Sequence, residues 1–93
     1  MNAIIKIREI KRIYLHTPSQ WDAFSDEGIP VWIRFHRGIL IVKIGSPDGD
    51  IWTAYHGKEI FSKMYGDYKS EFISYRELVY LTKNVLDLPE KGH

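Results

Sequence analysis

The fold is decided by residues 31–44, which read VWIRFHRGILIVKI. Before Arg37-Gly38, apolar residues alternate with Trp32, Arg34 and His36, and after it an apolar run begins. This pattern is typical of two β-strands joined by a tight turn. A turn with either two or four loop residues pairs position 35 with 40, 33 with 42 and 31 with 44. We therefore predict an antiparallel strand pair.

The two faces of this strand pair differ chemically. One face is entirely apolar and is expected to be core: Val31, Ile33, Phe35, Leu40, Val42 and Ile44. The other, which we call the second face, mixes aromatic, basic and aliphatic side chains: Trp32, Arg34, His36, Ile39, Ile41 and Lys43. Such a mixture is neither an ordinary core nor an ordinary solvated surface, so function is first sought there.

Two segments precede the strand pair. Residues 3–16 fit a strand, because Ile5 and Ile7 alternate with basic residues, but Ile7, Ile10 and Tyr14 also share a helical face. Because β-branched residues are dense and no N-cap precedes the run, we favour a strand, especially over 10–16. A short helix is then expected from Thr17, the N-cap, to Gly28.

That helix rests on two further signals. Pro18 suits the first helical position, and Trp21 and Phe24, spaced i, i+3, supply an apolar side.

A turn signal, SPDG at 46–49, follows the strand pair. It should lead into a strand around 52–55. A three-residue loop with a glycine bulge places Trp52 and Ala54 on the core face, and we prefer it; a longer loop would place Ile51 and Thr53 there. The next strand is predicted from Lys58 to Tyr65, with Phe61 opposite Trp52. Gly66 and Asp67, which follow it, end the strand.

The final element is a capped helix. Ser74 is the expected N-cap, with Glu77 completing a capping box. Apolar residues at spacings of three and four form its buried stripe: Leu78, Leu81, Val85 and Leu88. Pro89 ends it. The chain thus predicts one α+β domain over residues 1–93: an antiparallel meander of about four strands, a short helix before it and a longer one after it, with one helix on the apolar face.

Composition bounds the class of protein. The 93 residues are 44% hydrophobic, enough for one compact core, and include no cysteine. There is therefore no disulfide framework, thiolate nucleophile or zinc site of the cysteine type. No apolar run approaches the ~20 residues of a membrane span, and the first residues lack the long apolar segment of a signal peptide. A soluble cytoplasmic protein is expected.

The net charge of +1 is segregated along the chain. Residues 1–16 carry four basic residues and one acid, residues 17–29 three acids, and residues 30–46 three basic residues. A dedicated nucleic-acid binder usually has a stronger basic excess. Local charge of this kind suits a protein partner.

Catalytic and metal motifs are absent from the sequence. His16, His36 and His56 are not spaced to place two metal ligands on one element, and no phosphate or dinucleotide loop occurs. His36 and His56 could approach each other in some registers, with Arg37 and Lys58 nearby, as in a metal-independent nuclease. We expect instead surface histidines, no catalytic residue, no metal and no cofactor.

Two surfaces are candidates for binding a partner. The first is the second face, comprising Trp32, Arg34, His36 and Lys43 with Tyr55 alongside. It could be covered by residues 3–16 or by the capped final helix, could bind a protein, or could stack nucleic-acid bases. The second surface is an aromatic and acidic loop that contains Tyr65, Asp67, Tyr68 and Glu71. The alternative to binding is that the rings of this loop close the edge of the core.

The order of elements resembles that of small immunity proteins of bacterial toxin–immunity systems, of the polymorphic or contact-dependent inhibition kind. The resemblance spans roughly residues 12–88 and lies in the 17–21 helix signal, the strands of 31–44, the strand around 52–55 and the capped helix from Ser74. It implies a non-enzymatic inhibitor that binds its cognate toxin in the cytoplasm. The family shares no catalytic or binding residues to carry over.

The resulting hypothesis is a small cytoplasmic protein-interaction module, an immunity protein that neutralises a toxin. The first alternative is a nucleic-acid-binding regulator that uses the basic strand pair, and the second is a small metal-independent nuclease. A homodimer through an uncovered second face is also open, whereas a membrane partner is not expected.

Overall fold

The central hairpin has the predicted register. The computed structural model describes residues 4–14 and 17–90. In it, β3 (Pro30–His36) and β4 (Ile39–Ile44) are antiparallel. The predicted pairs are all present: Val31 with Ile44, Ile33 with Val42, and Phe35 with Leu40.

The turn between these strands has two residues, the shorter of the two predicted lengths. Arg37 has φ 53° and Gly38 has φ 76°, so both lie in the left-handed region that two-residue hairpin turns of type I′ require. A Cβ at position 38 would also collide with the backbone of Asp67. Glycine is therefore needed at 38 for its conformation and for space.

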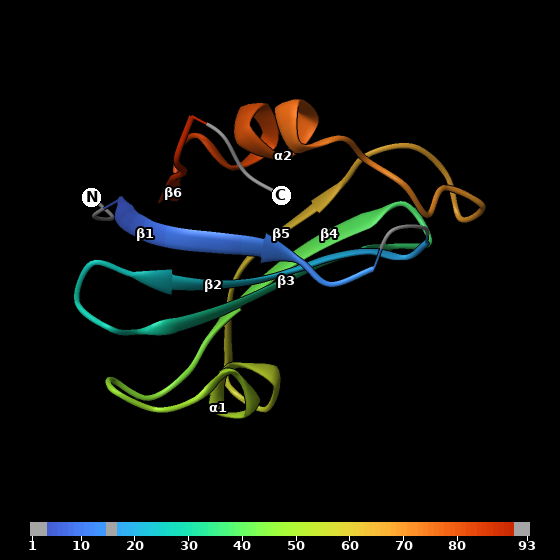
Figure 1. Ribbon diagram of the computed structural model, residues 1–93. Helices are drawn as coiled ribbons and strands as arrows, with labels where there is room; N and C mark the ends of the chain where they lie inside the picture. Colours follow the sequence, from blue (N-terminus) through green and yellow to red (C-terminus); the bar gives the residue numbers. More distant parts are fainter. Residues whose placement is uncertain (1–3, 15–16, 91–93) are drawn as a thin grey trace.

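Six strands form one sheet in the order β5-β4-β3-β2-β1-β6 (Figure 1). The others are β1 (Ile5–Arg12), β2 (Ser19–Ser25), β5 (Lys58–Met64) and β6 (Leu86–Asp87). All neighbours are antiparallel except β1 and β6, which are parallel. The α+β class is thus confirmed, but the predicted count of about four strands is too low.

Two helices lie on opposite sides of the sheet. Figure 1 shows α2 (Tyr75–Thr82) above one face and α1 (Ile51–Tyr55) below the other. α1 contacts β3 and β4. Leu78 and Leu81 of α2 pack with the apolar sheet residues in one core. Within the described ranges, no helix has the length and apolar character that crossing a membrane requires.

The predicted core face is correct. Five of its six residues are at most 1% exposed, and Ile44 is partly buried against them. The other strands add buried apolar side chains to this face: Ile7, Ile10, Trp21, Ala23 and Leu86.

The helix predicted from Thr17 to Gly28 is wrong, because residues 19–25 form β2. Every second residue of β2 is buried, with Trp21 and Ala23 both at 0% exposure, while Phe24 lies on the opposite face. β2 is hydrogen-bonded to β1 on one side and to β3 on the other. Pairing with two neighbours outweighs a weak local helix signal.

The strand predicted around 52–55 is also wrong. Asp50 accepts a hydrogen bond from the backbone N–H of Trp52 at 3.1 Å and is the N-cap of α1. Trp52 is 63% exposed, not in the core. The predicted strand over 58–65 is confirmed as β5, but it pairs directly with β4, so Phe61 lies opposite Val42 rather than Trp52.

The two ends of the chain are partly as predicted. Residues 5–12 form a strand, β1, as favoured, while Ile13 and Tyr14 lie outside it and 15–16 are outside the described residues. The final helix ends at Thr82. Val85 and Leu88 therefore pack against the core from beyond the helix, and β6 between them was not predicted.

The segment from Tyr65 to Ser74 is tied to the sheet at two places, and this positions α2. At the β3–β4 turn, Gly38 donates to the carbonyl of Ser70 at 2.8 Å and accepts from the N–H of Tyr65 at 2.7 Å. Glu71 accepts from the N–H of Arg37 at 2.6 Å.

The second tie is the buried hydroxyl of Ser19 on β2. Its Oγ accepts from the N–H of Ile73 at 3.0 Å and lies 3.3 Å from the Ile73 carbonyl. Arg12 donates to that carbonyl at 3.0 Å, with its guanidinium 4.4 Å from the Trp21 ring and 5.2 Å from the Phe72 ring. Burial lowers the pKa of Arg12.

The predicted capping box is confirmed at the start of α2. Ser74 Oγ accepts from the N–H of Glu77 at 3.1 Å, and the Glu77 carboxylate accepts from the N–H of Ser74 at 2.9 Å. The same carboxylate accepts from the Tyr65 hydroxyl at 2.7 Å. The bond from the Ser74 backbone and then that from Tyr65 lower the pKa of Glu77.

A Glu77→Gln variant is expected to lose part of the acid sensitivity of folding. The Glu77 pKa is lower in the folded state, so its ionised form contributes stability at a pH above the ordinary glutamate pKa of about 4.3. This contribution is lost as the pH falls from that value through the lower pKa of the folded state. Urea midpoints between about pH 6 and pH 3 should fall less steeply in Glu77→Gln than in wild type. Exposed Glu59→Gln is the control; equal slopes for all three proteins would contradict the assignment.

Candidate functional site

The second face is partly covered, and the cover is α1. Trp32 on β3 is only 4% exposed, because the Tyr55 ring meets it edge to face at 5.2 Å. Residues 5–12 do not lie across this face, since β1 joins the sheet beside β2. Neither of the two covers that the sequence suggested, the described part of residues 3–16 or the capped final helix, lies here; the cover is α1, a segment that was predicted as a strand.

Two cations surround the covered ring. Lys43 Nζ lies 5.3 Å from the Trp32 ring and 5.8 Å from the Tyr55 ring, and donates to the Tyr55 carbonyl at 3.3 Å. The Arg34 guanidinium lies 5.2 Å from the Trp32 ring. Four predicted site residues therefore meet in one cluster, and cation–π contacts of this kind contribute about 0.5–2 kcal/mol each. The Trp32 ring itself is not open for stacking.

The most exposed ring here is Trp52, which the sequence reasoning placed in the core. Trp52 stacks on Tyr55 at 5.2 Å with 20° between the planes, and His56 contacts Trp52 edge to face at 4.8 Å. The missed signal was Asp50 as an N-cap followed by Trp52, Tyr55 and His56 at helical spacing.

An open pocket of about 340 Å³ lies beside this ring stack. Its polar lining is Gln20 and Asp22 from β2 and Arg34 from β3, and its rings are Tyr14, Trp32, Trp52 and Tyr55. Burial raises the pKa of Asp22, and the charge of Lys11 on the neighbouring strand opposes this rise. A second pocket of about 290 Å³ shares Asp22 and continues along β1 and β2 past Phe24.

The remaining predicted site residues lie at the other end of the hairpin. His36 Nδ1 is 2.8 Å from Glu71 Oε2, in ion-pair distance, and Glu71 also binds the β3–β4 turn. Asp67 accepts from the N–H of Lys69 at 2.9 Å within its own loop. Tyr65 holds Glu77, and Tyr68 is 73% exposed. These side chains mainly organise the loop, apart from Tyr68.

His36 and His56 are not brought together. His36 is the last residue of β3 and pairs with Ile39 at the turn end of β4. His56 follows α1 and lies two residues before Lys58, which pairs with Ile44 at the other end of β4. Five residue steps of an antiparallel strand separate these ends by about 17 Å. Over residues 4–14 and 17–90, no three His, Cys, Asp or Glu side chains gather to hold a metal ion.

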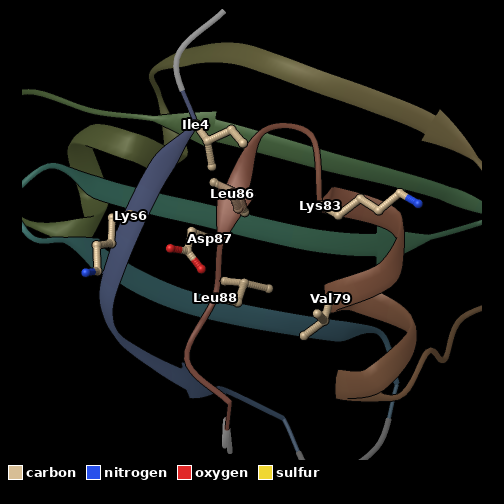
Figure 2. Close-up of a pocket in the computed structure, with 7 residues that line it drawn as sticks. All are labelled: Ile4, Lys6, Val79, Lys83, Leu86, Asp87 and Leu88. Carbon is tan, nitrogen blue, oxygen red and sulfur yellow. The ribbon is translucent and has the colours of Figure 1, made fainter.

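A third pocket, of about 360 Å³, lies between β1, β6 and α2 (Figure 2). Its wall is mainly aliphatic, from Ile4, Val79, Leu86 and Leu88. Figure 2 shows the ammonium groups of Lys6 and Lys83 extending in opposite directions, away from the space between them. Polar groups do not converge there as they do in the pocket beside Trp52.

Comparison of the chain with protein-family models, with curated proteins and with solved structures finds no match.

Replacing Tyr55 by alanine is expected to uncover Trp32. The variant loses an aromatic edge-to-face contact and should unfold about 1–2 kcal/mol more easily. In a Trp52→Phe background, which leaves only the buried Trp21 and Trp32 as emitters, Tyr55→Ala should red-shift the fluorescence and increase acrylamide quenching.

Tyr68→Ala, in the same background, removes an exposed ring remote from Trp32 and should leave both readouts unchanged. Unaltered quenching in Tyr55→Ala would contradict the covering role of α1.

Proposed function

We propose that this protein is a small cytoplasmic protein-interaction module, and specifically an immunity protein that binds and neutralises a cognate toxin. The observation that carries the proposal is the exposed aromatic surface of α1. Trp52 is 63% exposed and Tyr55 41% exposed; the two rings stack on each other, and Tyr55 packs edge to face on buried Trp32. Rigid, partly exposed Trp and Tyr side chains are the usual energetic centres of protein interfaces.

The surroundings of α1 offer room for a partner. α1 contacts β3 and β4, and the two open pockets that share Asp22 continue beside it along β1 and β2. Exposed Ile13 and Tyr14 border this area. A partner that covers the stack could therefore also rest on the adjoining sheet and bury the apolar area that a specific complex needs.

Charge next to the stack would orient the partner. The β2–β3 turn and the loop before α1 meet where the N–H of Asp48 donates to the carbonyl of Gly28 at 3.1 Å. Their four acids are Asp26, Glu27, Asp48 and Asp50, and none of them belongs to either ion pair in the described part of the chain. A partner with basic residues facing this end would associate faster and in one orientation.

The immunity role rests on the predicted order of elements. Of these elements, the hairpin and the capped helix are present in the structure. The 17–21 segment and the 52–55 segment have exchanged types, strand for helix and helix for strand. The proposal therefore stands mainly on the α1 surface. A homodimer through the same surface is an alternative that the capture experiment separates from it.

Trp52→Ala is expected to abolish partner capture. The tagged wild-type protein should recover one stoichiometric protein from its native host, and loss of the central ring should weaken that complex by on the order of 30-fold or more, as for interface hot spots. Tyr80→Ala is the matched control, because Tyr80 is 66% exposed on α2, on the other side of the sheet.

The toxin role has its own readout. The captured protein should arrest growth when it is expressed alone and be harmless beside wild type, whereas Trp52→Ala should not protect. Self-association of the chain as its sole interaction, or equal capture by Trp52→Ala, would contradict the proposal.

A further inference from the structure

The pocket beside Trp52 holds two opposite charges that belong to no ion pair in the described part of the chain, although the Arg34 guanidinium also contacts the Trp32 ring. Asp22 and Arg34 both line it. The described residues contain two ion pairs, Arg8 with Glu9 and His36 with Glu71, and neither involves these side chains. Arg34 Nε is also shielded from solvent without a hydrogen-bond partner. Charges left unpaired inside a partly buried pocket are a reason to look for a ligand.

The strand register fixes the separation of these two groups. Asp22 is opposite Trp32, and Gln20 is opposite Arg34, so Asp22 and Arg34 are diagonal neighbours on the second face. Diagonal positions of an antiparallel pair lie about 7–8 Å apart, and their Cβ atoms are somewhat closer than that. A ligand that faces both residues would meet a carboxylate and a guanidinium side by side.

The rings of the pocket favour a flat ligand. Trp52 and Tyr55 are nearly parallel, with 20° between their planes, and Trp52 is largely exposed. A planar molecule can therefore stack on this wall. The two charges of the lining compensate each other, so a neutral ring that carries hydrogen-bond donors and acceptors is favoured over a cation or an anion. A volume of about 340 Å³ accommodates such a ring.

We propose that this pocket binds a guanine-type base. The base stacks on Trp52, its ring N–H and amino group donate to the Asp22 carboxylate, and its carbonyl oxygen accepts from Arg34. Guanine is the base that presents a donor pair and acceptors on one flat ring, and Arg recognises its acceptors in other proteins. The base could be that of a free nucleotide or of a single strand.

This site goes beyond the toxin-binding role and does not require it. Neither proposal depends on a result from the other, because base binding is measured with the isolated chain and partner capture with host proteins.

The test is titration of the wild-type chain with GMP, AMP and UMP, followed by quenching of tryptophan fluorescence. These probes share ribose and phosphate, so differences report on the base. GMP should quench saturably and bind at least tenfold more tightly than AMP or UMP. Absence of saturable quenching by GMP up to millimolar concentration, or equal affinity for all three nucleotides, would overturn the proposal.

Asp22→Asn is the informative variant, with Asp87→Asn as the control on the far side of the sheet. Burial raises the pKa of Asp22, which means that the ionised carboxylate does not stabilise the folded state. Removing this charge should therefore not destabilise the fold, and urea midpoints verify this. We expect at least a tenfold loss of GMP affinity in Asp22→Asn, unchanged affinity in Asp87→Asn and unchanged weak AMP binding. Full GMP affinity in a folded Asp22→Asn protein would exclude this site.

A nine-nucleotide thymidine strand with or without one central guanine identifies the source of the base. Tighter, salt-sensitive binding of the guanine strand than of GMP indicates single-stranded nucleic acid, and GMP binding at least as tight indicates a free nucleotide. Equal binding of the two strands would contradict recognition of the base.

Discussion

The structure depends on the register of the β3–β4 hairpin. Side chains alternate between faces with a period of two, so a slip by one residue would exchange the faces of the whole strand. The two-residue turn fixes the register through positive φ angles at Arg37 and Gly38, and the 65–74 segment packs on that turn through Ser70 and Glu71. With the register set, the apolar face is committed to α2, and Trp32, Arg34 and Lys43 are committed to the opposite side.

The candidate site exists because the second face is only half covered. α1 is five residues long and covers β3 and β4, and its Tyr55 removes Trp32 from water. The cover ends at β2, and the exposed edge of α1 together with Asp22 forms the pocket. Protein binding and base binding both use the exposed Trp52 ring at this boundary. The stack on α1 supplies apolar area for the first, and the unpaired charges beside it supply specificity for the second.

Prediction from the sequence succeeded where a local signal and the tertiary environment agree. The alternation in 31–44, the strand at 58–64 and the Ser74–Glu77 capping box are all of this kind. It failed for β2, because Thr17 and Pro18 resemble a helix start while both sides of the segment pair in the sheet. It also failed for α1, where the cap at Asp50 was overlooked in favour of a continued meander. β6 is too short for any pattern.

The same reasons explain which residues of the candidate site could be predicted from the sequence. Strand alternation grouped Trp32, Arg34 and Lys43, and these three do meet. His36 was grouped with them but lies beside Glu71 at the turn, and Tyr55 joins them from a helix instead of the predicted strand. Trp52 was misplaced with α1, and Asp22 was hidden inside the helix wrongly predicted there. Glu71 and Tyr65 looked like binding residues, but their long-range partners, Arg37 and Glu77, could not be read from the sequence.

The most direct measurement is the solvent exposure of the three tryptophan indoles, taken by NMR with a soluble paramagnetic relaxation agent. Trp21, Trp32 and Trp52 are 0%, 4% and 63% exposed. The account predicts strong relaxation of the Trp52 indole signal and protection of the other two. Comparable relaxation of Trp32 and Trp52, or protection of Trp52, would contradict the register, the cover by α1 and the site built on them.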